Sequence, residues 1–290
     1  MRILVLRALG LGDLLTAVPA LRGLRFAFPR AEIMLAAPAW LADAVERIDA
    51  VDRLLPTAEL APIDFAEPDL AVNLHGRGPQ SVELLKATAP RHLVTYGQDN
   101  WPSERHEVLR WCGLLQRHGI RCDPYDFRLR PVGERGDRIV IHPGASTGAR
   151  RWPVERYAAV ARELGSEVVV TAGPGELDLA RRIAPEPFAG SLSELMDLVA
   201  TARLVICGDT GVAHVATAYR TPSVLVFGPV SPGLWGPLRG PHRALWHGRT
   251  GDTFAGEPDP GLLEITPAEV LDAVGGVLCA SESSARVTSV

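Results

Sequence analysis

Lysine is almost missing from this chain of 290 residues: Lys86 is the only one, and arginine supplies the remaining positive side-chain charge. Lysine and arginine together number 30 against 34 aspartates and glutamates, and the formal net charge is −4. A chain without surplus positive charge has no bulk attraction for a polyanion, so the composition argues against a nucleic-acid partner. The arginine bias is typical of genome composition, and a single arginine therefore does not by itself indicate a ligand site.

Cysteine is scarce as well, and its four copies show no metal-binding or disulfide pattern. Neither CxxC spacing nor a close cluster with histidine occurs among Cys112, Cys122, Cys207 and Cys279. We therefore expect no structural zinc site and no disulfide framework, in keeping with a reducing cytoplasm.

Long apolar runs are also lacking. No stretch approaches the roughly 20 apolar residues that a membrane-spanning helix needs. The apolar segment 3–9 is broken by Gly10, Gly12 and Asp13 before any signal-peptide cleavage pattern appears. These absences predict a cytoplasmic protein with no transmembrane segment. The apolar fraction of 47% is nevertheless enough for the cores of two modest domains.

One segment combines the features of a strand, an anion-binding loop and the start of a helix. Residues 138–141 are a short apolar run of the kind buried in a parallel sheet. The loop 143–149 is rich in small residues, and Pro153 suits the first turn of the helix that follows. Such a unit can bind an anion, and Arg150 and Arg151 would add guanidinium groups that suit phosphate oxygens. An ordinary βα connection with two solvated arginines explains this segment equally well.

Strands and helices alternate along the chain, and the alternation starts again after a linker. Strands are expected at 3–6, 32–36, 51–55, 69–74, 92–96, 138–141, 167–171, 204–207 and 223–227. Helices are expected at 14–28, 39–47, 80–87, 103–117, 153–164, 176–183, 192–201, 212–219 and 267–278, with a loop-rich region at 229–261. This alternation predicts doubly wound parallel sheets, and the charged segment 123–137 suits a linker. We therefore predict two Rossmann-like α/β domains, residues 1–130 and 131–290, facing across a cleft.

The first strand leads into residues 10–13, Gly-Leu-Gly-Asp, at the kind of strand end where open α/β sheets bind ligands. The glycines resemble a phosphate loop, but Leu15 breaks the GxGxxG pattern, so the nicotinamide fingerprint is absent. Asp13 is most simply the N-cap of the following helix, where N–H groups would reduce the basicity of a carboxylate. The alternative is a general base at the mouth of the cleft, and on the sequence alone the cap is the simpler explanation.

A later strand end is followed by residues 208–211, Gly-Asp-Thr-Gly, and a helix. Asp209 is the expected N-cap of that helix, while Thr210 and Gly211 offer open backbone N–H groups. A buried structural histidine is the commoner explanation of His214, but the density of polar groups here favours a ligand. Two helix N-termini and an arginine can neutralise a diphosphate. The sequence has no Asp-x-Asp motif after a strand that would indicate a magnesium site. We therefore predict a diphosphate site without metal or cofactor.

Four segments, taken together and in order, resemble glycosyltransferase family 9, which includes the bacterial lipopolysaccharide heptosyltransferases. They are residues 12–21 (Gly-Asp-Leu-Leu-Thr-Ala-Val-Pro-Ala-Leu), 142–153 (with His-Pro-Gly-Ala-Ser and Arg-Trp-Pro), 208–214 (Gly-Asp-Thr-Gly-Val-Ala-His) and 227–229 (Phe-Gly-Pro). Residues 73–76, Asn-Leu-His-Gly, also resemble a motif that these enzymes carry after a strand of the N-terminal domain. Any one motif would be weak evidence, whereas four in order are specific.

The resemblance implies a GT-B fold in which residues 1–130 bind the acceptor and residues 131–290 bind a nucleoside-diphosphate sugar. It implies an inverting, metal-independent transfer, typically from ADP-heptose. The acceptor would be a glycan, a glycolipid or a small molecule, and the sequence does not say which. A lipid-linked acceptor would bring the enzyme to the inner face of the membrane.

Matching motifs also assign the family's roles to residues of this chain. Asp13 would be the general base, and Arg150 would stand where the family has a diphosphate-binding lysine, with the same charge and a different geometry. The other donor residues would be Ser146 and Thr147 at the phosphates, Asp209, Thr210, Gly211 and His214 around the diphosphate and first sugar, and Glu176 near the ribose. The acceptor side would be formed by Gly12, Asn73 and His75.

Two other classes of function stay open at this point. A sugar-nucleotide epimerase would share the architecture, but it needs acid and base groups on both sides of the sugar, and only Asp13 is a clear candidate. A nucleotide-sugar-binding protein without turnover would have no need of both Asp13 and the polar residues at 209–214. The leading hypothesis is therefore an inverting glycosyltransferase.

Overall fold

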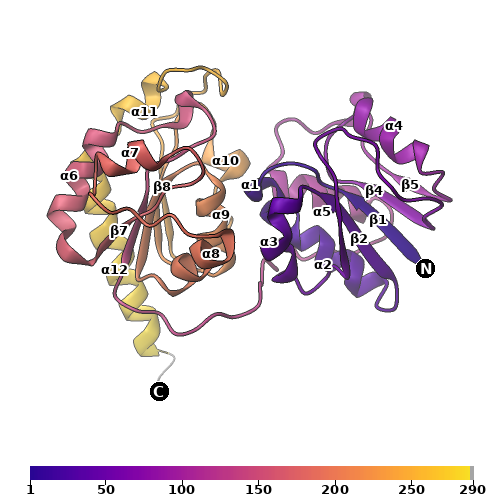
Figure 1. The fold of residues 1–290 in the computed structure, drawn as a ribbon, viewed down its shortest axis with the longest axis horizontal. Helices are drawn as coiled ribbons and strands as arrows, with labels where there is room; N and C mark the ends of the chain where they lie inside the picture. The colour runs from indigo at the N-terminus through magenta and orange to yellow at the C-terminus, as the bar shows by residue number, and fades with distance from the viewer. Residues whose placement is uncertain (288–290) are drawn as a thin grey trace. The chain divides into compact units, whose positions relative to one another are not determined.

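The computed structural model describes the backbone of residues 1–287 and the side chains of residues 1–281. The chain divides into two compact units, one comprising Met1–Arg130 and the other beginning at Pro131. Each unit has its own five-stranded sheet, and helices cover the sheet (Figure 1). All paired strands within these two sheets are parallel. The predicted α/β class with two Rossmann-like units is therefore confirmed.

In the first unit the strand order is β3-β2-β1-β4-β5. Leu6 at the end of β1 is aligned with Asn73 at the end of β4, so the segments that follow both strands leave the sheet side by side. The elements of this unit are β1 (Arg2–Leu6), α1 (Leu11–Thr16), α2 (Val18–Ala27), β2 (Glu32–Ala37), α3 (Ala42–Glu46), β3 (Arg53–Pro56), β4 (Leu70–Asn73), α4 (Gln80–Ala87), β5 (Leu93–Val94) and α5 (Glu107–Gln116), with short 3₁₀ turns at Ala39–Leu41 and Gln98–Asn100.

The single helix expected at 14–28 is in fact two helices. The first, α1, begins three residues earlier than expected and ends at Thr16, and α2 starts at Val18 with Pro19 in its first turn. Proline has no N–H to continue a helical ladder, but it is tolerated where a helix begins. The early start of α1 places Asp13 inside the first turn of a helix instead of before it.

In the second unit the strand order is β10-β9-β8-β6-β7. An isolated parallel bridge joins Thr171, just after β7, to Phe188, and it occupies the place of a further edge strand. The elements are β6 (Ile139–His142), α6 (Val154–Leu164), β7 (Val168–Val170), α7 (Leu177–Arg181), α8 (Leu192–Thr201), β8 (Leu204–Gly208), α9 (Gly211–Ala218), β9 (Ser223–Val226), α10 (Pro232–Trp235), β10 (His242–Leu245), α11 (Pro260–Glu264) and α12 (Pro267–Val287), with 3₁₀ turns at Gly148–Arg150 and Gly165–Glu167. Both sheets therefore change winding direction beside their first strand, as doubly wound sheets do.

Helices cover both faces of the second sheet. On one face α6 and α12 pack together, and on the other α8 packs against α9 (Figure 1). The core under α6 and α12 contains Trp152 and Tyr157, whose rings meet edge to face with centroids 4.8 Å apart. The indole N–H of Trp152 donates to the carbonyl of Ile265 at 3.0 Å, so this large side chain is buried with its polar atom satisfied. The packing fixes the residues just before α6, which include Arg150.

The region 229–261, expected to be loop-rich, contains a strand that the sequence did not indicate. This strand, β10, pairs in parallel with β9 and forms the edge of the sheet. Its four residues, His-Arg-Ala-Leu, include no β-branched side chain and remain partly exposed. Neither propensity nor alternation therefore marks it, and the pairing with β9 decides its conformation. The last helix, α12, also runs beyond its expected end at 278 as far as Val287.

Within the described residues, no helix combines the length and the apolar character that crossing a bilayer requires.

Candidate active site

Most of the predicted site residues follow the two strands at which each sheet changes direction; Asn73 ends one of these strands, and Glu176 follows β7 instead. In the first unit these strands are β1 and β4, and in the second they are β6 and β8. Helices that run to opposite faces leave a crevice at such a switch point, and open α/β sheets bind ligands there. The segments after β1 and β4 contain Gly12, Asp13 and His75, and those after β6 and β8 contain Ser146, Thr147, Arg150, Asp209, Thr210, Gly211 and His214.

Asp13 lies in the first turn of α1, as the third residue of the helix. Its Oδ2 accepts the backbone N–H of Gly10 at 3.3 Å, and Gly10 is the residue at the N-cap position. The prediction that Asp13 is the N-cap is therefore wrong, because the helix starts at Leu11 and the carboxylate reaches back to the cap amide from inside the turn. The Asp13 side chain keeps 29% of its surface exposed, so it remains accessible to a ligand. Gly12 precedes it in the same turn.

Arg7 is the main residue at this site that sequence reasoning missed. Its guanidinium is buried and donates from Nε to the backbone carbonyl of Asp13 at 2.9 Å and from Nη2 to Asp13 Oδ1 at 3.2 Å. Nη1 donates to the carbonyl of Leu74, which belongs to the segment after β4. One arginine at the end of β1 thus ties together the two segments expected to meet the acceptor. A single arginine after an apolar strand carries no pattern that would have distinguished it.

Asn73, predicted on the acceptor side, is buried and fully engaged within the protein. Its amide Nδ2 has three acceptors for its two N–H groups, namely the carbonyl of Gly76 at 3.1 Å and the hydroxyls of Ser81 and Thr95 at 3.0 Å each. Its Oδ1 accepts the backbone N–H of His75 at 3.0 Å. The contacts make Asn73 the residue that shapes this loop, and they leave it little capacity to bind a ligand directly.

His75 is half-buried beside the Arg7–Asp13 pair. Burial and the positive charge of Arg7 lower the pKa of its imidazole, against the opposing influence of Glu59 and Asp13. The ring is therefore neutral near pH 7. Among the described residues, no hydrogen-bond partner is found for its Nδ1. Nδ1 is also buried, so only the exposed part of this neutral ring is open to a ligand.

In the second unit, the structure brings Arg150 and Asp209 together. Arg150 Nη1 lies 3.4 Å from Asp209 Oδ2, where the segment after β6 meets the segment after β8. Asp209 is nearly buried, whereas the Arg150 side chain keeps 26% of its surface exposed. The Nε of Arg150 is buried without a hydrogen-bond partner among the described residues, so the ion pair with Asp209 places a partly exposed arginine close to the start of α9.

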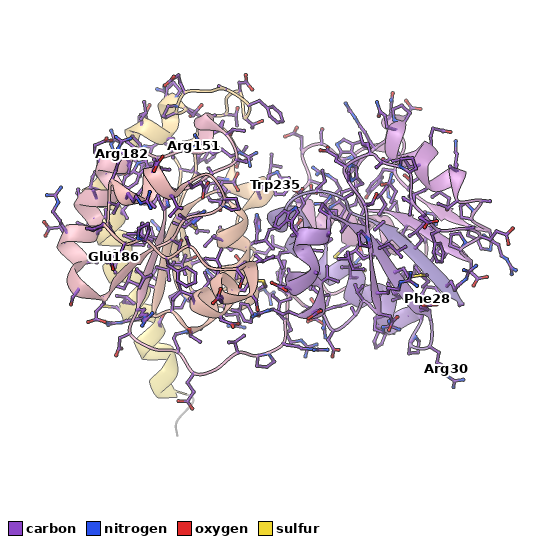
Figure 2. All side chains as sticks on the ribbon, in the orientation of Figure 1. Phe28, Arg30, Arg151, Arg182, Glu186 and Trp235 are labelled. Carbon is purple, nitrogen blue, oxygen red and sulfur yellow. The ribbon has the colours of Figure 1, made fainter. Side chains whose placement is uncertain are left out.

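The N-cap of α9 is Thr210, and the prediction that Asp209 fills this role is wrong. The hydroxyl of Thr210 accepts the backbone N–H of Val212 at 3.2 Å, and α9 starts at Gly211. Threonine is a good cap, and because Thr210 caps the helix, the Asp209 carboxylate can pair with Arg150 instead. His214 follows within the first turn, half-buried, with its ring edge to face against Trp235 of α10 at 6.2 Å between centroids; Figure 2 labels Trp235.

The segment between β6 and α6 is held at several points by other parts of the unit. Thr147 Oγ1 donates to the carbonyl of Thr253 at 2.7 Å, and the N–H of Ala149 donates to the carbonyl of Ala255 at 2.9 Å. Arg151, labelled in Figure 2, folds back and donates twice to the carbonyl of Ala145, at 3.2 and 3.1 Å. Arg151 therefore braces the loop, and Arg150 is left as the arginine that faces Asp209. Ser146 in the same loop is exposed.

Glu176 lies against the beginning of this loop, just before α7. Its Oε2 accepts the N–H of Gly173 at 2.8 Å and lies 3.7 Å from Nε2 of His142. A methyl group on Gly144 would collide with the Glu176 carboxylate, so the glycine makes room for it. Burial lowers the pKa of His142 while the Glu176 carboxylate raises it. The carboxylate thus has a fixed position and keeps some exposure.

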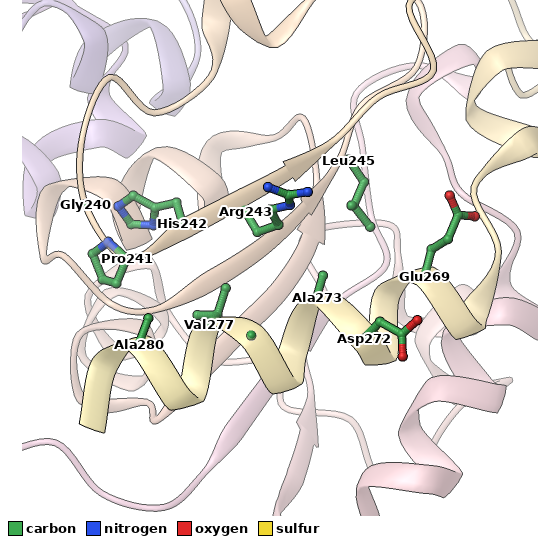
Figure 3. A pocket seen from close by; sticks show the side chains of 11 residues that line it. Gly240, Pro241, His242, Arg243, Leu245, Glu269, Asp272, Ala273, Val277 and Ala280 are labelled. Atoms are coloured by element: carbon green, nitrogen blue, oxygen red, sulfur yellow. The ribbon is translucent and has the colours of Figure 1, made fainter. Parts of the chain in front are cut away.

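A groove of about 640 Å³ lies elsewhere in this unit, between the edge strand β10 and α12 (Figure 3). Its lining includes His242 and Arg243 from the strand, and Glu269 and Asp272 from the helix. None of the predicted donor residues lines it. The groove therefore lies apart from the residues that the sequence predicts for the donor.

Solved structures of glycosyltransferases share this fold. The crystal structure of a glycosyl transferase family 9 protein from Veillonella parvula matches with a TM-score of 0.78 at 20% identity, over 96% of this chain and 97% of that one. The structure of the ADP-heptose lipopolysaccharide heptosyltransferase II of Escherichia coli matches with a TM-score of 0.76 at 22% identity, over 97% of this chain and all of that one. The protein thus has the GT-B class of glycosyltransferase fold.

Sequence comparison gives the family. The model of glycosyltransferase family 9 (heptosyltransferase) matches residues 106–254. Lipopolysaccharide heptosyltransferase 2 of Salmonella typhimurium is 25% identical, over 96% of this chain and 99% of that protein. Lipopolysaccharide heptosyltransferase 1 of Escherichia coli K12 is 26% identical, over 81% of this chain and 90% of that protein. The chain belongs to glycosyltransferase family 9 and is a glycosyltransferase, and the family predicted from the sequence motifs is confirmed.

Proposed function

We propose that this enzyme transfers heptose from ADP-heptose to a hydroxyl group of a lipopolysaccharide core acceptor, with inversion at the anomeric carbon and without a metal ion. The relatives named above are lipopolysaccharide heptosyltransferases, which supports both the donor and the acceptor class. The enzyme works in the cytoplasm, and a lipid-linked acceptor brings it to the inner face of the membrane. The unit Met1–Arg130 binds the acceptor and the unit from Pro131 binds the donor.

The observation that carries the proposal is the meeting of Arg150 with Asp209 at the N-terminus of α9. The start of an α-helix has free N–H groups and a partial positive charge, both of which favour phosphate oxygens. The guanidinium adds a full positive charge in a fork geometry that suits two oxygens at once. This arrangement can stabilise the negative charge that grows on the leaving ADP as the glycosidic bond breaks.

The remaining donor residues take positions around that centre. Thr210 and Gly211 present the first open amides of α9, and His214 is one turn along the same helix. In this proposal, Ser146 and Thr147 line the phosphates from the loop after β6. Glu176, already fixed against Gly173, offers its partly exposed carboxylate to the ribose hydroxyls.

On the acceptor side, Asp13 is the general base in this proposal. It accepts the proton of the attacking hydroxyl while that oxygen bonds to the anomeric carbon from the face opposite the diphosphate, and ADP leaves with the electron pair of the broken bond. The exposed part of the Asp13 carboxylate supports this role. His75, with its neutral ring, helps to orient the acceptor, and Asn73 holds the loop that presents it.

The test is release of ADP from ADP-heptose in the presence of truncated lipopolysaccharides that lack successive core heptoses. We expect ADP release that depends on one of these acceptors, with the new glycosidic linkage of inverted configuration by NMR. UDP- and GDP-sugars serve as donor controls and should not be turned over. Acceptor-independent turnover of the donor, or a preference for another nucleotide, would contradict the proposed reaction.

A further inference from the structure

A chain of alternating charges is buried behind Asp13. Arg7 Nη2 lies 3.2 Å from Asp13 Oδ1 and 2.9 Å from Glu107 Oε1, and the other oxygen of Glu107 pairs with Arg110. The side chains of Arg7, Glu107 and Arg110 are all at least nine-tenths buried, and only Asp13 at the end of the chain is accessible. The order Asp13–Arg7–Glu107–Arg110 alternates in sign, so the two positive and two negative charges of this cluster balance one another.

Burying charges is costly unless each group is paired and hydrogen-bonded, and this cluster meets that requirement. Glu107 Oε1 also accepts the indole N–H of Trp111 at 2.7 Å, and the Arg7 guanidinium lies over the Trp111 ring at 5.0 Å. Arg110 donates in addition to the backbone carbonyls of Pro102, Ser103 and Arg105. Arg110, at the far end of the cluster, is thus anchored to the backbone. Glu107 is in turn held by Arg110 and Trp111, so the buried group that contacts Arg7 has a fixed position.

The Arg7 guanidinium has a different kind of contact on each side. Toward α1 it holds both the backbone carbonyl and the carboxylate of Asp13, toward β4 it holds the carbonyl of Leu74, and toward α5 it holds Glu107. A planar group with five N–H donors can make these contacts together, whereas a lysine ammonium cannot match that fixed fork. The carboxylate of Asp13 is therefore oriented relative to the loop after β4, which contains His75.

We propose that Arg7 is a positioning residue of the transfer reaction: it fixes the Asp13 carboxylate in the orientation in which it receives the acceptor proton, and Glu107 fixes Arg7. The inference rests on the proposed role of Asp13 as general base. It assigns the function of a base-orienting group to a residue outside every motif that the sequence offered. Arg7 itself need not touch either substrate.

The test compares Arg7→Met, Arg7→Lys and Glu107→Gln as full-length proteins, with ADP-heptose and the truncated lipopolysaccharide that supports turnover. Arg7→Met should lower kcat by about 10²-fold, because a misplaced catalytic group loses that much, with little change in the KM for ADP-heptose. The acidic limb of the kcat/KM profile should move to higher pH, because a positive charge beside the carboxylate is gone. Arg7→Lys should keep the limb near its native position and recover part of kcat.

Glu107→Gln provides a readout of opposite sign. This change leaves the size of the side chain almost unaltered but removes the negative charge that balances Arg7, so the acidic limb should move to lower pH. A merely structural role of the cluster predicts no such pair of opposite shifts. Arg22→Met is the control for loss of an arginine ion pair, because Arg22 pairs with Asp126 at 2.8 Å in the same unit, although less deeply buried than Arg7, and it should leave kcat and the pH profile unchanged.

A double variant separates this inference from the proposed function. Asp13→Asn together with Arg7→Met should be no slower than Asp13→Asn alone, because Arg7 acts through Asp13. If Asp13→Asn is fully active, both the proposed base and this inference are wrong. If Asp13→Asn is inactive while folded Arg7→Met keeps native kcat and pH profile, only the positioning role is wrong. Should Arg7→Met fail to fold, native kcat in Arg7→Lys together with an unchanged pH profile in Glu107→Gln would overturn it.

Discussion

Replacing Arg150 by alanine gives the sharpest test of the donor site. The change removes a side chain that keeps about a quarter of its surface exposed and whose Nη1 lies 3.4 Å from Asp209 Oδ2. A hydrogen bond to a charged group contributes about 1.5–3 kcal/mol, and every 1.4 kcal/mol is a factor of about ten in affinity. We therefore expect Arg150→Ala to weaken binding of ADP-heptose by about 10- to 150-fold. Arg150→Lys should recover part of that loss, because it restores the charge without the fork.

The same substitution leaves Asp209 nearly buried without its cation, so an effect on folding has to be separated from one on binding. Removing one partner of a buried ion pair is destabilising in its own right. Urea unfolding without ligand measures that cost, and Asp209→Asn in the Arg150→Ala background should reduce it. Donor affinity should not return in the double variant, because no cation has been replaced.

Isothermal titration with ADP-heptose, repeated in EDTA, is the assay for this prediction. Native protein should bind equally well with and without the chelator, because Arg150 and the start of α9 supply the positive charge. Loss of binding in EDTA would show that a metal ion holds the diphosphate. Native affinity in a folded Arg150→Ala variant would show that the phosphates lie elsewhere.

Three further outcomes are expected. Asp13→Asn should lower kcat by about 10²–10⁴-fold, as removal of a general base does, with donor affinity from titration unchanged; near-native turnover would leave Asp13 without a catalytic role. Gly144→Ala should push the Glu176 carboxylate aside and raise the Kd of ADP more than that of inorganic pyrophosphate, whereas an equal effect on both would argue against a ribose contact. Burial, and then Arg220, lower the pKa of His242 from 6.5 to about 4, so the unfolded chain binds more protons between those values. Unfolding free energy should therefore fall as pH drops from about 6.5 toward 4, by at most about 3 kcal/mol from this residue, and urea titrations of His242→Gln should show a shallower fall.

Local sequence signals were sufficient for some elements of the fold. The helices expected at 80–87 and 192–201 begin and end at those residues in the structure. For α8 the reason is visible, since Ser191 caps the helix and Glu194 reaches back to the Ser191 N–H, a capping box followed by an apolar stripe. Where the hydrophobic periodicity and the capping residues indicate the same helix ends, the bounds predicted from the sequence agree with the structure.

The caps at the site itself could not be assigned in this way. Asp13 and Asp209 are good cap residues by type, but Gly10 and Thr210 take the cap positions. In both cases the aspartate is instead engaged by an arginine from another segment, Arg7 or Arg150. A side chain with a strong tertiary partner no longer follows its local preference, and the partner is not visible from spacing alone.

The buried charge cluster behind Asp13 could not be predicted from the sequence for the same reason. Arg7 and Glu107 are 100 positions apart in the chain, and no periodicity connects them. A buried arginine and a buried glutamate look like ordinary surface residues in a sequence, because these types are seldom buried. Only the structure, which brings the first residue of α5 to the residue that follows β1, shows that the two charges compensate one another.

Two glycines of the family motifs, Gly208 and Gly228, lie in the second unit where backbone segments cross closely. Their role there concerns this close approach and not an unusual backbone angle. A methyl group on Gly208 would lie 3.2 Å from the carbonyl oxygen of Arg150, and one on Gly228 would lie 2.9 Å from Cβ of Leu262 and 3.3 Å from the carbonyl oxygen of Ala149. The loop after β6 therefore passes closely over the ends of β8 and β9, and larger side chains at either position would push it away. Since that loop carries the guanidinium toward Asp209, these glycines act on donor binding through the path of the backbone. The motif residues thus divide into those that we expect to touch the diphosphate and those that let the loop come near enough to reach it.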